Sequence, residues 1–133
     1  MASEYDLKLD KFGIDMNRYR ELKYFCRQYP GKKKELKKLR QMADSLGSPS
    51  ADKAPRSSFV SDPTARRAEK MADLSHEIDI IEQAAYEADP YDWQELLRHV
   101  SEGVPVEHLE LTQCWRKFYE TRRRFYWLLS QRR

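Results

Sequence analysis

Residues 89–133 read DPYDWQELLRHVSEGVPVEHLELTQCWRKFYETRRRFYWLLSQRR, and this stretch decides the fold of the chain. Asp89 before Pro90 predicts a helix start, because the carboxylate can cap free amides and the proline ring already has helical φ. Apolar residues then recur at helical spacing on one face, namely Trp93, Leu96, Leu97 and Val100. Gly103 follows where helix C-termini favour glycine, so we expect this helix to end there.

Two further helical segments complete this stretch. Pro105 opens a short segment over residues 106–110, a brief turn follows, and a long helix is expected over about residues 113–130. A helix, a one-turn helix and a long basic helix are the parts of a helix-turn-helix, whose last helix lies in the DNA major groove. We therefore predict a helix-turn-helix DNA-binding head over residues 89–133.

The last helix has two faces of different chemistry. On a helical wheel advanced by 100° per residue, three residues lie within about 20° of Phe118 and form an apolar stripe: Leu111, Phe125 and Leu129. The opposite face is cationic with a single acid and comprises Arg116, Lys117, Glu120, Arg123, Arg124 and Trp127. Arg123 lies about 140° from Phe118, so we expect it to be exposed. We expect Phe125 to be buried against Trp93, Leu97 and Leu109.

This basic face indicates contact with nucleic acid. Residues 111–133 hold seven arginines or lysines and one glutamate, a net charge of +6, whereas solvated helices usually alternate the signs of their charges. The alternative is a solvated helix packed by its apolar stripe. For a DNA-binding helix we expect phosphate or guanine contacts from Arg116, Lys117, Arg123 and Arg124. The same surface would include Gln113, Trp115 and Tyr119 near base edges or sugars, with Thr112 at its start.

Composition favours an all-α fold. The 133 residues allow one domain or two small ones, and charged residues make up 35% of the chain with only four glycines. Charge is segregated along the chain, with a net of +5 over residues 31–56 and −9 over residues 67–110. A protein with basic ends and an acidic middle can direct one surface toward a polyanion while its other surfaces repel it.

Residues 1–88 predict an N-terminal helical body. Leu7, Leu9, Phe12 and Ile14 can pack, and Asn17 is expected to cap a first helix that ends at Pro30-Gly31. A second helix carries an apolar stripe of Leu36, Leu39, Ala43 and Leu46. Its lysine run over residues 32–38 is interpreted as a solvated face, with phosphate contact as the alternative.

A linker and a long helix complete this body. Residues 47–61 are rich in serine and proline, and Phe59-Val60 is their only apolar pair. Asp62-Pro63 predicts the start of a helix over residues 64–88, whose apolar seam is Met71, Leu74, Ile78, Ile81, Ala85 and Ala88. The seam allows two arrangements: packing against the stripe of the second helix, or a coiled-coil homodimer that pairs two DNA-binding heads.

Three segments of this sequence resemble a known group of regulators: YRELKYFCRQYPGKKKELKKL, IDIIEQA and EGVPVEHLELTQCWRKFYETRRRFYWLL. They are similar to late-gene transcription regulators of the RinA and ArpU type from Gram-positive phages and prophages, whose C-terminal part is like the fourth region of bacterial sigma factors. In such proteins a serine or threonine commonly caps the recognition helix, and Thr112 or Cys114 stands there in this chain. The resemblance implies phage transcription control, with host RNA polymerase as a partner.

Other classes of chemistry find little support in the sequence. His76, His99 and His108 lack the spacing of a closed zinc site, and we interpret them as solvated or capping residues. No glycine-rich phosphate loop or nucleophile motif is present, so we expect neither an enzyme nor a bound metal or cofactor. Cys26 and Cys114 fit reduced thiols in a cytoplasmic compartment, which the resemblance implies is that of a bacterial host cell, and no membrane-spanning run is present.

Two functions from different classes remain open. The first is a sequence-specific regulator that binds double-stranded DNA through the helix-turn-helix head. The second is a phage-encoded inhibitor or adaptor that binds a host protein through its acidic middle and exposed aromatic residues, without DNA binding.

Overall fold

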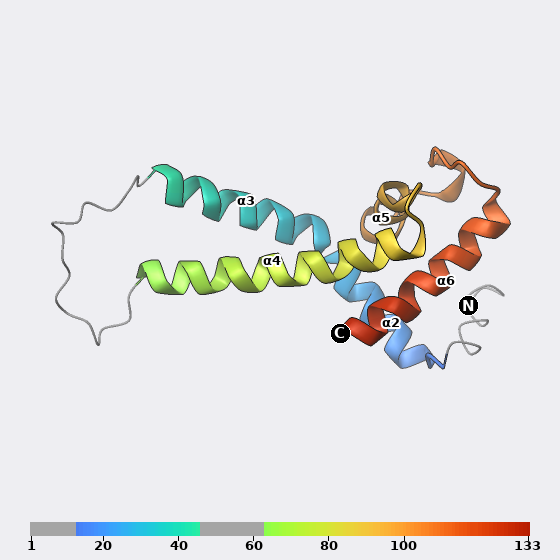
Figure 1. The fold of residues 1–133 in the computed structure, drawn as a ribbon, viewed down its shortest axis with the longest axis horizontal. Coiled ribbons are helices and arrows are strands. Elements are labelled where there is room, and N and C mark those ends of the chain that lie inside the picture. The colour runs from blue at the N-terminus through green and yellow to red at the C-terminus, as the bar shows by residue number, and fades with distance from the viewer. Residues whose placement is uncertain (1–12, 46–62) are drawn as a thin grey trace, which may run out of the picture. The chain divides into compact units, whose positions relative to one another are not determined.

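The computed structural model of the chain describes residues 13–45 and 63–133, and these residues form helices and connecting loops with no strand. The helices are α2 (Met16–Arg27), α3 (Tyr29–Ser45), α4 (Pro63–Ala88), α5 (Trp93–Glu102) and α6 (Trp115–Arg132), with a 3₁₀ helix η2 at Val106–His108 (Figure 1). The predicted all-α class is therefore confirmed. Several predictions lie outside the described residues: the packing of Leu7, Leu9 and Phe12, the place of Leu46 in the stripe, the linker with Phe59-Val60, and the cap at Asp62.

The described residues form two compact units, and the boundary between them differs from the predicted one. The larger unit joins the described part of Met1–Pro30 to Asp79–Arg133, and the smaller unit is Gly31–Ile78. We predicted a boundary at Asp89-Pro90, but that position lies inside the larger unit, because α2 packs against α5 and α6. The Tyr19 and Tyr126 rings meet edge to face with centroids 5.0 Å apart. These contacts join residues too distant in sequence for a periodicity argument to find.

The smaller unit is a hairpin of α3 and the first half of α4, which run side by side in opposite directions (Figure 1). Leu36 of α3 and Leu74 and Ile78 of α4 are buried. Two ion pairs join the helices: Lys32 with Glu77 at 3.1 Å, and Lys70 with Glu35 at 2.7 Å. The seam of α4 therefore packs within one chain here, and a homodimer through residues 64–88 stays a prediction.

Apolar faces from four helices form the core of the larger unit. Its most deeply buried side chains are Leu22 and Cys26 of α2, Ile81, Ala84 and Ala85 of α4, Leu96 of α5, and Phe118, Phe125 and Leu129 of α6. The predicted stripe of the last helix is confirmed at Phe118, Phe125 and Leu129. Burying aromatic and aliphatic side chains of this size contributes roughly 1.5–3 kcal/mol each, so this stripe anchors α6 firmly.

The start of α2 corrects one predicted cap. Asp15, not Asn17, is the N-cap, and its Oδ1 accepts a hydrogen bond from the Arg18 amide at 2.8 Å. An N-cap oxygen reaches the third amide of the helix, and from Asp15 that amide belongs to Arg18. Pro30 falls in the first turn of α3, where a proline needs no amide partner, so it opens the second helix and does not end the first.

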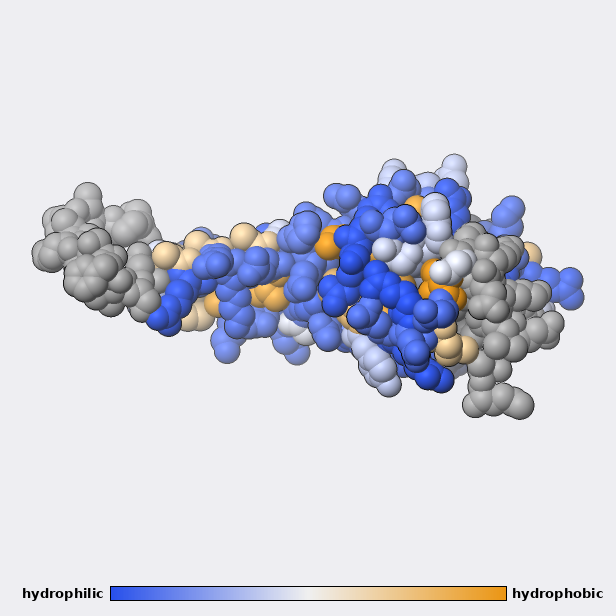
Figure 2. Space-filling model, turned by 90° about the horizontal axis from the view of Figure 1, so that it is seen from below, coloured by the Kyte–Doolittle hydropathy of each residue, from blue (hydrophilic) through white to orange (hydrophobic). Residues whose placement is uncertain are grey.

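The face of the described residues that Figure 2 shows is mainly hydrophilic. Figure 2 shows one face on which blue hydrophilic residues predominate and apolar side chains reach the surface in small patches. Within residues 13–45 and 63–133, none of the helices is both long and apolar enough to cross a membrane.

Candidate nucleic-acid interface

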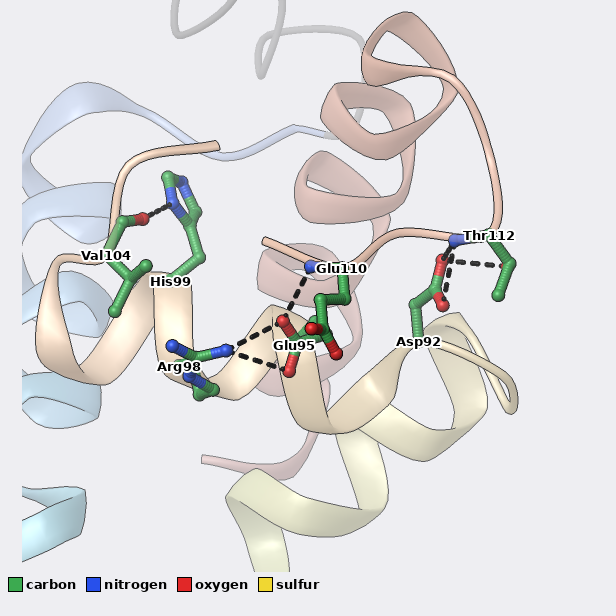
Figure 3. Close-up of polar contacts among 7 residues, drawn as sticks. All are labelled: Asp92, Glu95, Arg98, His99, Val104, Glu110 and Thr112. Carbon is green, nitrogen blue, oxygen red and sulfur yellow. Dashed lines mark hydrogen bonds and ion pairs between the residues drawn. The ribbon is translucent and has the colours of Figure 1, made fainter. Parts of the chain in front are cut away.

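The segment between α5 and α6 is held against α5 by carboxylates, as Figure 3 shows. Asp92, only 3% exposed, accepts hydrogen bonds from the Thr112 amide at 3.0 and 3.2 Å and from the Thr112 hydroxyl at 3.0 Å. A buried carboxylate is costly unless donors surround it, and Thr112 supplies two of them. The contact fixes the chain three residues before α6 begins.

Asp89 makes a second attachment beside the first. Its Oδ1 accepts hydrogen bonds from the Tyr91 and Asp92 amides at 3.0 and 3.1 Å, so the carboxylate caps the turn that leads into α5. Its Oδ2 accepts a hydrogen bond from the Gln113 side-chain amide at 2.5 Å. The sequence predicted Asp89 as the cap of a helix that starts at Pro90, but α5 begins three residues later, at Trp93, with Asp92 as its N-cap. The sequence also placed Thr112 and Gln113 on the DNA surface. In the structure both side chains donate hydrogen bonds to these carboxylates, and these contacts hold the start of α6 in place.

One turn along α5, Glu95 holds the same segment at another point. Glu95 Oε1 accepts a hydrogen bond from the Glu110 amide at 2.9 Å, and Arg98 bonds both of its oxygens at 2.9 and 3.1 Å (Figure 3). The hydrogen bond from the Glu110 amide is the main reason that the pKa of Glu95 lies below its ordinary value; burial opposes it, and Arg98 lowers the pKa further. Glu95 is therefore ionised at neutral pH.

His99 connects α5 to both the following segment and α6. Its Nδ1 lies 2.8 Å from the Val104 carbonyl oxygen, its Nε2 lies 3.1 Å from Arg122 Nη1, and its ring meets Phe118 edge to face at 5.3 Å. Burial, followed by the charges of Arg122 and Lys23, lowers the pKa of His99. A neutral ring with the proton on Nδ1 satisfies both hydrogen bonds, since Nδ1 donates to Val104 and Nε2 accepts from Arg122. The sequence grouped His99 with solvated or capping histidines, and that interpretation is wrong for this residue.

These contacts explain where α6 starts. The helix begins at Trp115 with Cys114 as N-cap, two residues later than predicted, and no side chain caps its first amides. Thr112 does not occupy the cap position, because it stands three residues before Trp115, and its hydroxyl donates a hydrogen bond to Asp92. The predicted ambiguity between Thr112 and Cys114 is thus resolved in favour of Cys114, whose thiol is a weak acceptor.

The exposed face of α6 retains most of the predicted cations. Arg116, Lys117 and Arg124 are exposed, and Trp115 is 47% exposed with the Arg116 guanidinium 5.3 Å from its ring centroid. Lys117 and Arg124 are seven residues apart and lie on one side of the helix, separated by about 10 Å along its axis. Tyr119 is half-buried, and the Arg122 guanidinium lies 4.8 Å above its ring. The basic face of α6, meaning Arg116, Lys117 and Arg124, is the candidate interface.

Arg123 corrects the helical-wheel prediction. It is 3% exposed, and its Nη2 donates to Glu120 at 2.6 Å, so it lies outside the basic face. The protein covers a wider arc of α6 than one stripe, because Tyr126 and Leu128, about 80° to either side of Phe118, are buried as well. A long side chain at the edge of so wide a buried arc can lay its aliphatic stem against the protein and become buried itself.

Basic residues of α2 form a second cationic group that sequence reasoning did not single out. Arg20, Lys23 and Arg27 line a hollow of about 310 Å³ together with Tyr24, which is 71% exposed. Their spacing of three and four residues was the available signal, since residues so spaced share one side of a helix. The hollow belongs to the same unit as α6.

Comparisons with known proteins identify no relative of this chain, because no family model, curated protein or solved structure matches it. Among the residues that the structure describes, no group of three histidine, cysteine or acidic side chains could hold a metal ion. Cys26 is buried, Cys114 is exposed, and both are free thiols.

Proposed function

We propose that this protein binds double-stranded DNA through the basic face of α6 and thereby regulates transcription. The observation that carries the proposal is the exposure of Arg116, Lys117 and Arg124 on one side of a helix that nearby carboxylates hold in place. These cations are exposed, no helix of the described residues covers them, and they have fixed positions on one face of the helix. Such side chains can contact the phosphates and the base edges of a duplex.

In this proposal α5, η2 and α6 act as a helix-turn-helix. The major groove is about 12 Å wide and admits one helix, and the N-terminal residues of a recognition helix contact base edges. Arg116 and Lys117, in the first turn of α6, would read bases, and Arg124, two turns later, would contact phosphate. The first amides of α6 carry no side-chain cap, which suits a helix end that approaches a phosphate.

The hydrogen bonds of Asp89, Asp92 and Glu95 support the same function without contacting DNA, because they hold the segment that precedes α6. A side chain discriminates between bases only when its backbone is held within a fraction of an ångström, and supporting hydrogen bonds supply that constraint. Thr112 and Gln113 would serve DNA binding indirectly, by fixing the start of α6 on α5.

The resemblance to phage late-gene regulators adds the biological setting of the proposal. A phage-encoded protein of this type would act in the bacterial host cytoplasm and bind host RNA polymerase in addition to DNA. The alternative, an adaptor without DNA binding, predicts that the basic face of α6 has no role in nucleic-acid affinity.

The proposal is tested by selecting duplexes from a random pool with the full chain and measuring affinity for the selected and the random duplex. We expect tighter binding to the selected duplex and a loss of affinity with salt, with a log–log slope of about −0.9 for each phosphate contact. Arg116→Ala should weaken binding to the selected duplex by about 1–3 kcal/mol and bring its affinity toward that for random DNA. Equal affinity for both pools would reject sequence-specific recognition, and no salt-sensitive binding at all would favour the adaptor.

A further inference from the structure

A groove of about 410 Å³ opens on the larger unit between three helices. Asp79, Glu82, Tyr86 and Glu87 line it from α4, Trp93 from α5 and Arg132 from α6. None of these residues belongs to the basic face of α6 or to the contacts that hold the start of that helix. The groove combines aromatic rings with carboxylates, a pairing that the proposed DNA contact does not use.

The aromatic part of the groove consists of two rings in contact. Tyr86 and Trp93 meet edge to face, with centroids 6.3 Å apart and ring planes at 74°. Tyr86 is 57% exposed, and Trp93 is half-buried. The face of an aromatic ring carries negative potential, and an exposed ring of this kind attracts a guanidinium or ammonium group within about 6 Å.

The carboxylates of the groove add net negative charge. Asp79 and Glu87 are exposed, and Glu82 accepts a hydrogen bond from the Tyr29 hydroxyl at 2.5 Å. Against these three acids stands one cation, Arg132, whose guanidinium is paired with Glu87. That pair shows that the groove already accommodates a guanidinium against one of its carboxylates. A net charge of about −2 remains, so the groove repels phosphate and attracts a cation.

The dimensions of the groove indicate the kind of cation. Asp79 and Glu87 are eight residues apart on α4, about 12 Å along its axis, which is too far for both to coordinate one metal ion. The same 12 Å matches three or four residues of an extended peptide. A volume near the lower end for ligand pockets suits one long side chain with an apolar stem and a charged head.

We propose that this groove binds an arginine-bearing segment of a partner protein, with the arginine guanidinium packed against Tyr86 and paired with Asp79. Arginine fits better than lysine because its planar head both stacks on a ring and pairs with a carboxylate. The groove and the basic face of α6 belong to one unit and have opposite charge, so the protein can hold a duplex and a basic protein segment at separate places. This role goes beyond DNA binding and does not depend on it.

The test uses the full chain and an acetylated, amidated pentapeptide of alternating glycine and arginine. The readout is the indole N–H resonance of Trp93, assigned with the Trp93→Phe variant. The control peptide replaces arginine by citrulline, which keeps the planar shape and length of the head group but carries no charge and has an acceptor oxygen in place of one nitrogen. We expect a saturable shift with the arginine peptide and none with the citrulline peptide.

Matched variants locate the binding. Tyr86→Ala and Asp79→Asn should each raise the Kd of the arginine peptide about fivefold, the effect expected for one exposed cation–π contact or ion pair. Tyr24→Ala and Asp73→Asn remove an exposed tyrosine and an exposed aspartate outside the groove and should change the Kd by less than about twofold. Tyr86→Ala should leave duplex DNA binding unchanged, so failure of this proposal is distinguishable from failure of DNA binding.

Three outcomes would overturn the proposal. The first is an absence of saturable binding of the arginine peptide up to about 10 mM, which corresponds to a negligible affinity. The second is an equal effect of the groove variants and their controls, which would mean diffuse attraction to the acidic surface. The third is a dimer of this chain that is lost in the Tyr86→Ala variant, because a second copy of the chain would then occupy the groove.

Discussion

Two helices of this chain, α3 and α6, carry dense runs of basic residues, yet they differ in how firmly the protein holds them. α6 buries six of its eighteen residues, and the segment before it is attached to α5 and to the turn before α5 by Asp89, Asp92 and Glu95. α3 buries only Tyr29 and Leu36 among its seventeen residues. Ion pairs at Lys32 and Glu35 join it to α4.

This difference shows why charge density alone is a weak sign of a nucleic-acid surface. Both helices carry basic residues, but discrimination between base pairs requires side chains at fixed positions, and fixed positions require a buried anchor. Lys32, at the start of the α3 run, is engaged by Glu77, as expected of a solvated helix that forms ion pairs. In the proposed function, duplex recognition therefore belongs to α6, and α3 has a structural role.

The largest expected effect concerns the anchor of α6. Phe125→Ala should cost about 3–5 kcal/mol of unfolding free energy, because the ring is fully buried and leaves a cavity in a dense core. Leu36→Ala, the matched change on α3, should cost less, about 2 kcal/mol, since a two-helix hairpin can close around the smaller residue. Urea unfolding of both variants checks the difference. Equal losses would mean that α3 is anchored as firmly as α6.

The second effect concerns the attachment before α6. Asp92→Ala leaves the amide and hydroxyl of Thr112 without their acceptor and should cost about 1–3 kcal/mol of stability. Asp92→Asn keeps one acceptor oxygen and should retain part of that stability. Both values come from urea unfolding, and hydrogen exchange should show faster exchange at the Thr112 amide. An Asp92→Ala variant with unchanged stability would show that α6 does not depend on this contact.

A smaller effect follows from the protonation of His99. Burial and the nearby charges of Arg122 and Lys23 lower its pKa, so the folded protein binds the proton less readily than the unfolded chain. The stability due to neutral His99 is present above about pH 6.5 and is lost as the pH falls from there through the lowered pKa. Urea unfolding between pH 8 and pH 5 should show this loss in the wild type. The loss should be smaller in His99→Gln, which does not titrate, and an identical pH profile would contradict the assignment.

Local patterns predicted much of this fold. The apolar stripe of α6 places Phe118, Phe125 and Leu129 in the core, and Gly103 ends α5 with a left-handed φ of 74°, as the sequence indicates. Such features depend on neighbours within one or two turns, which a helical wheel represents. The antiparallel pairing of α3 with α4 was one of two arrangements that the seam allowed.

The missed features depend on contacts between distant residues or on small differences in geometry. Thr112 and Gln113 bond to Asp92 and Asp89, which lie about twenty residues earlier in the chain. Because these contacts join distant residues, the sequence shows no periodic pattern that would predict them. The burial of Arg123 depends on how wide an arc of α6 is covered, which a helical wheel does not report. The division into two units follows from the packing of α2 on α5 and α6, and it implies that a fragment beginning at residue 89 would lack part of its core.

The central claim is that duplex binding resides on α6 and not on α3, and two charge-matched double variants test it directly. Lys117→Ala with Arg124→Ala removes two exposed cations from α6, and Lys34→Ala with Lys38→Ala removes two from α3. The measurement is the affinity of the full chain for a selected duplex over a range of salt concentrations. The α6 variant should bind more weakly, with a log–log salt slope reduced in magnitude by about two, while the α3 variant keeps the wild-type slope. A reduced slope in the α3 variant with an unchanged α6 variant would contradict the account.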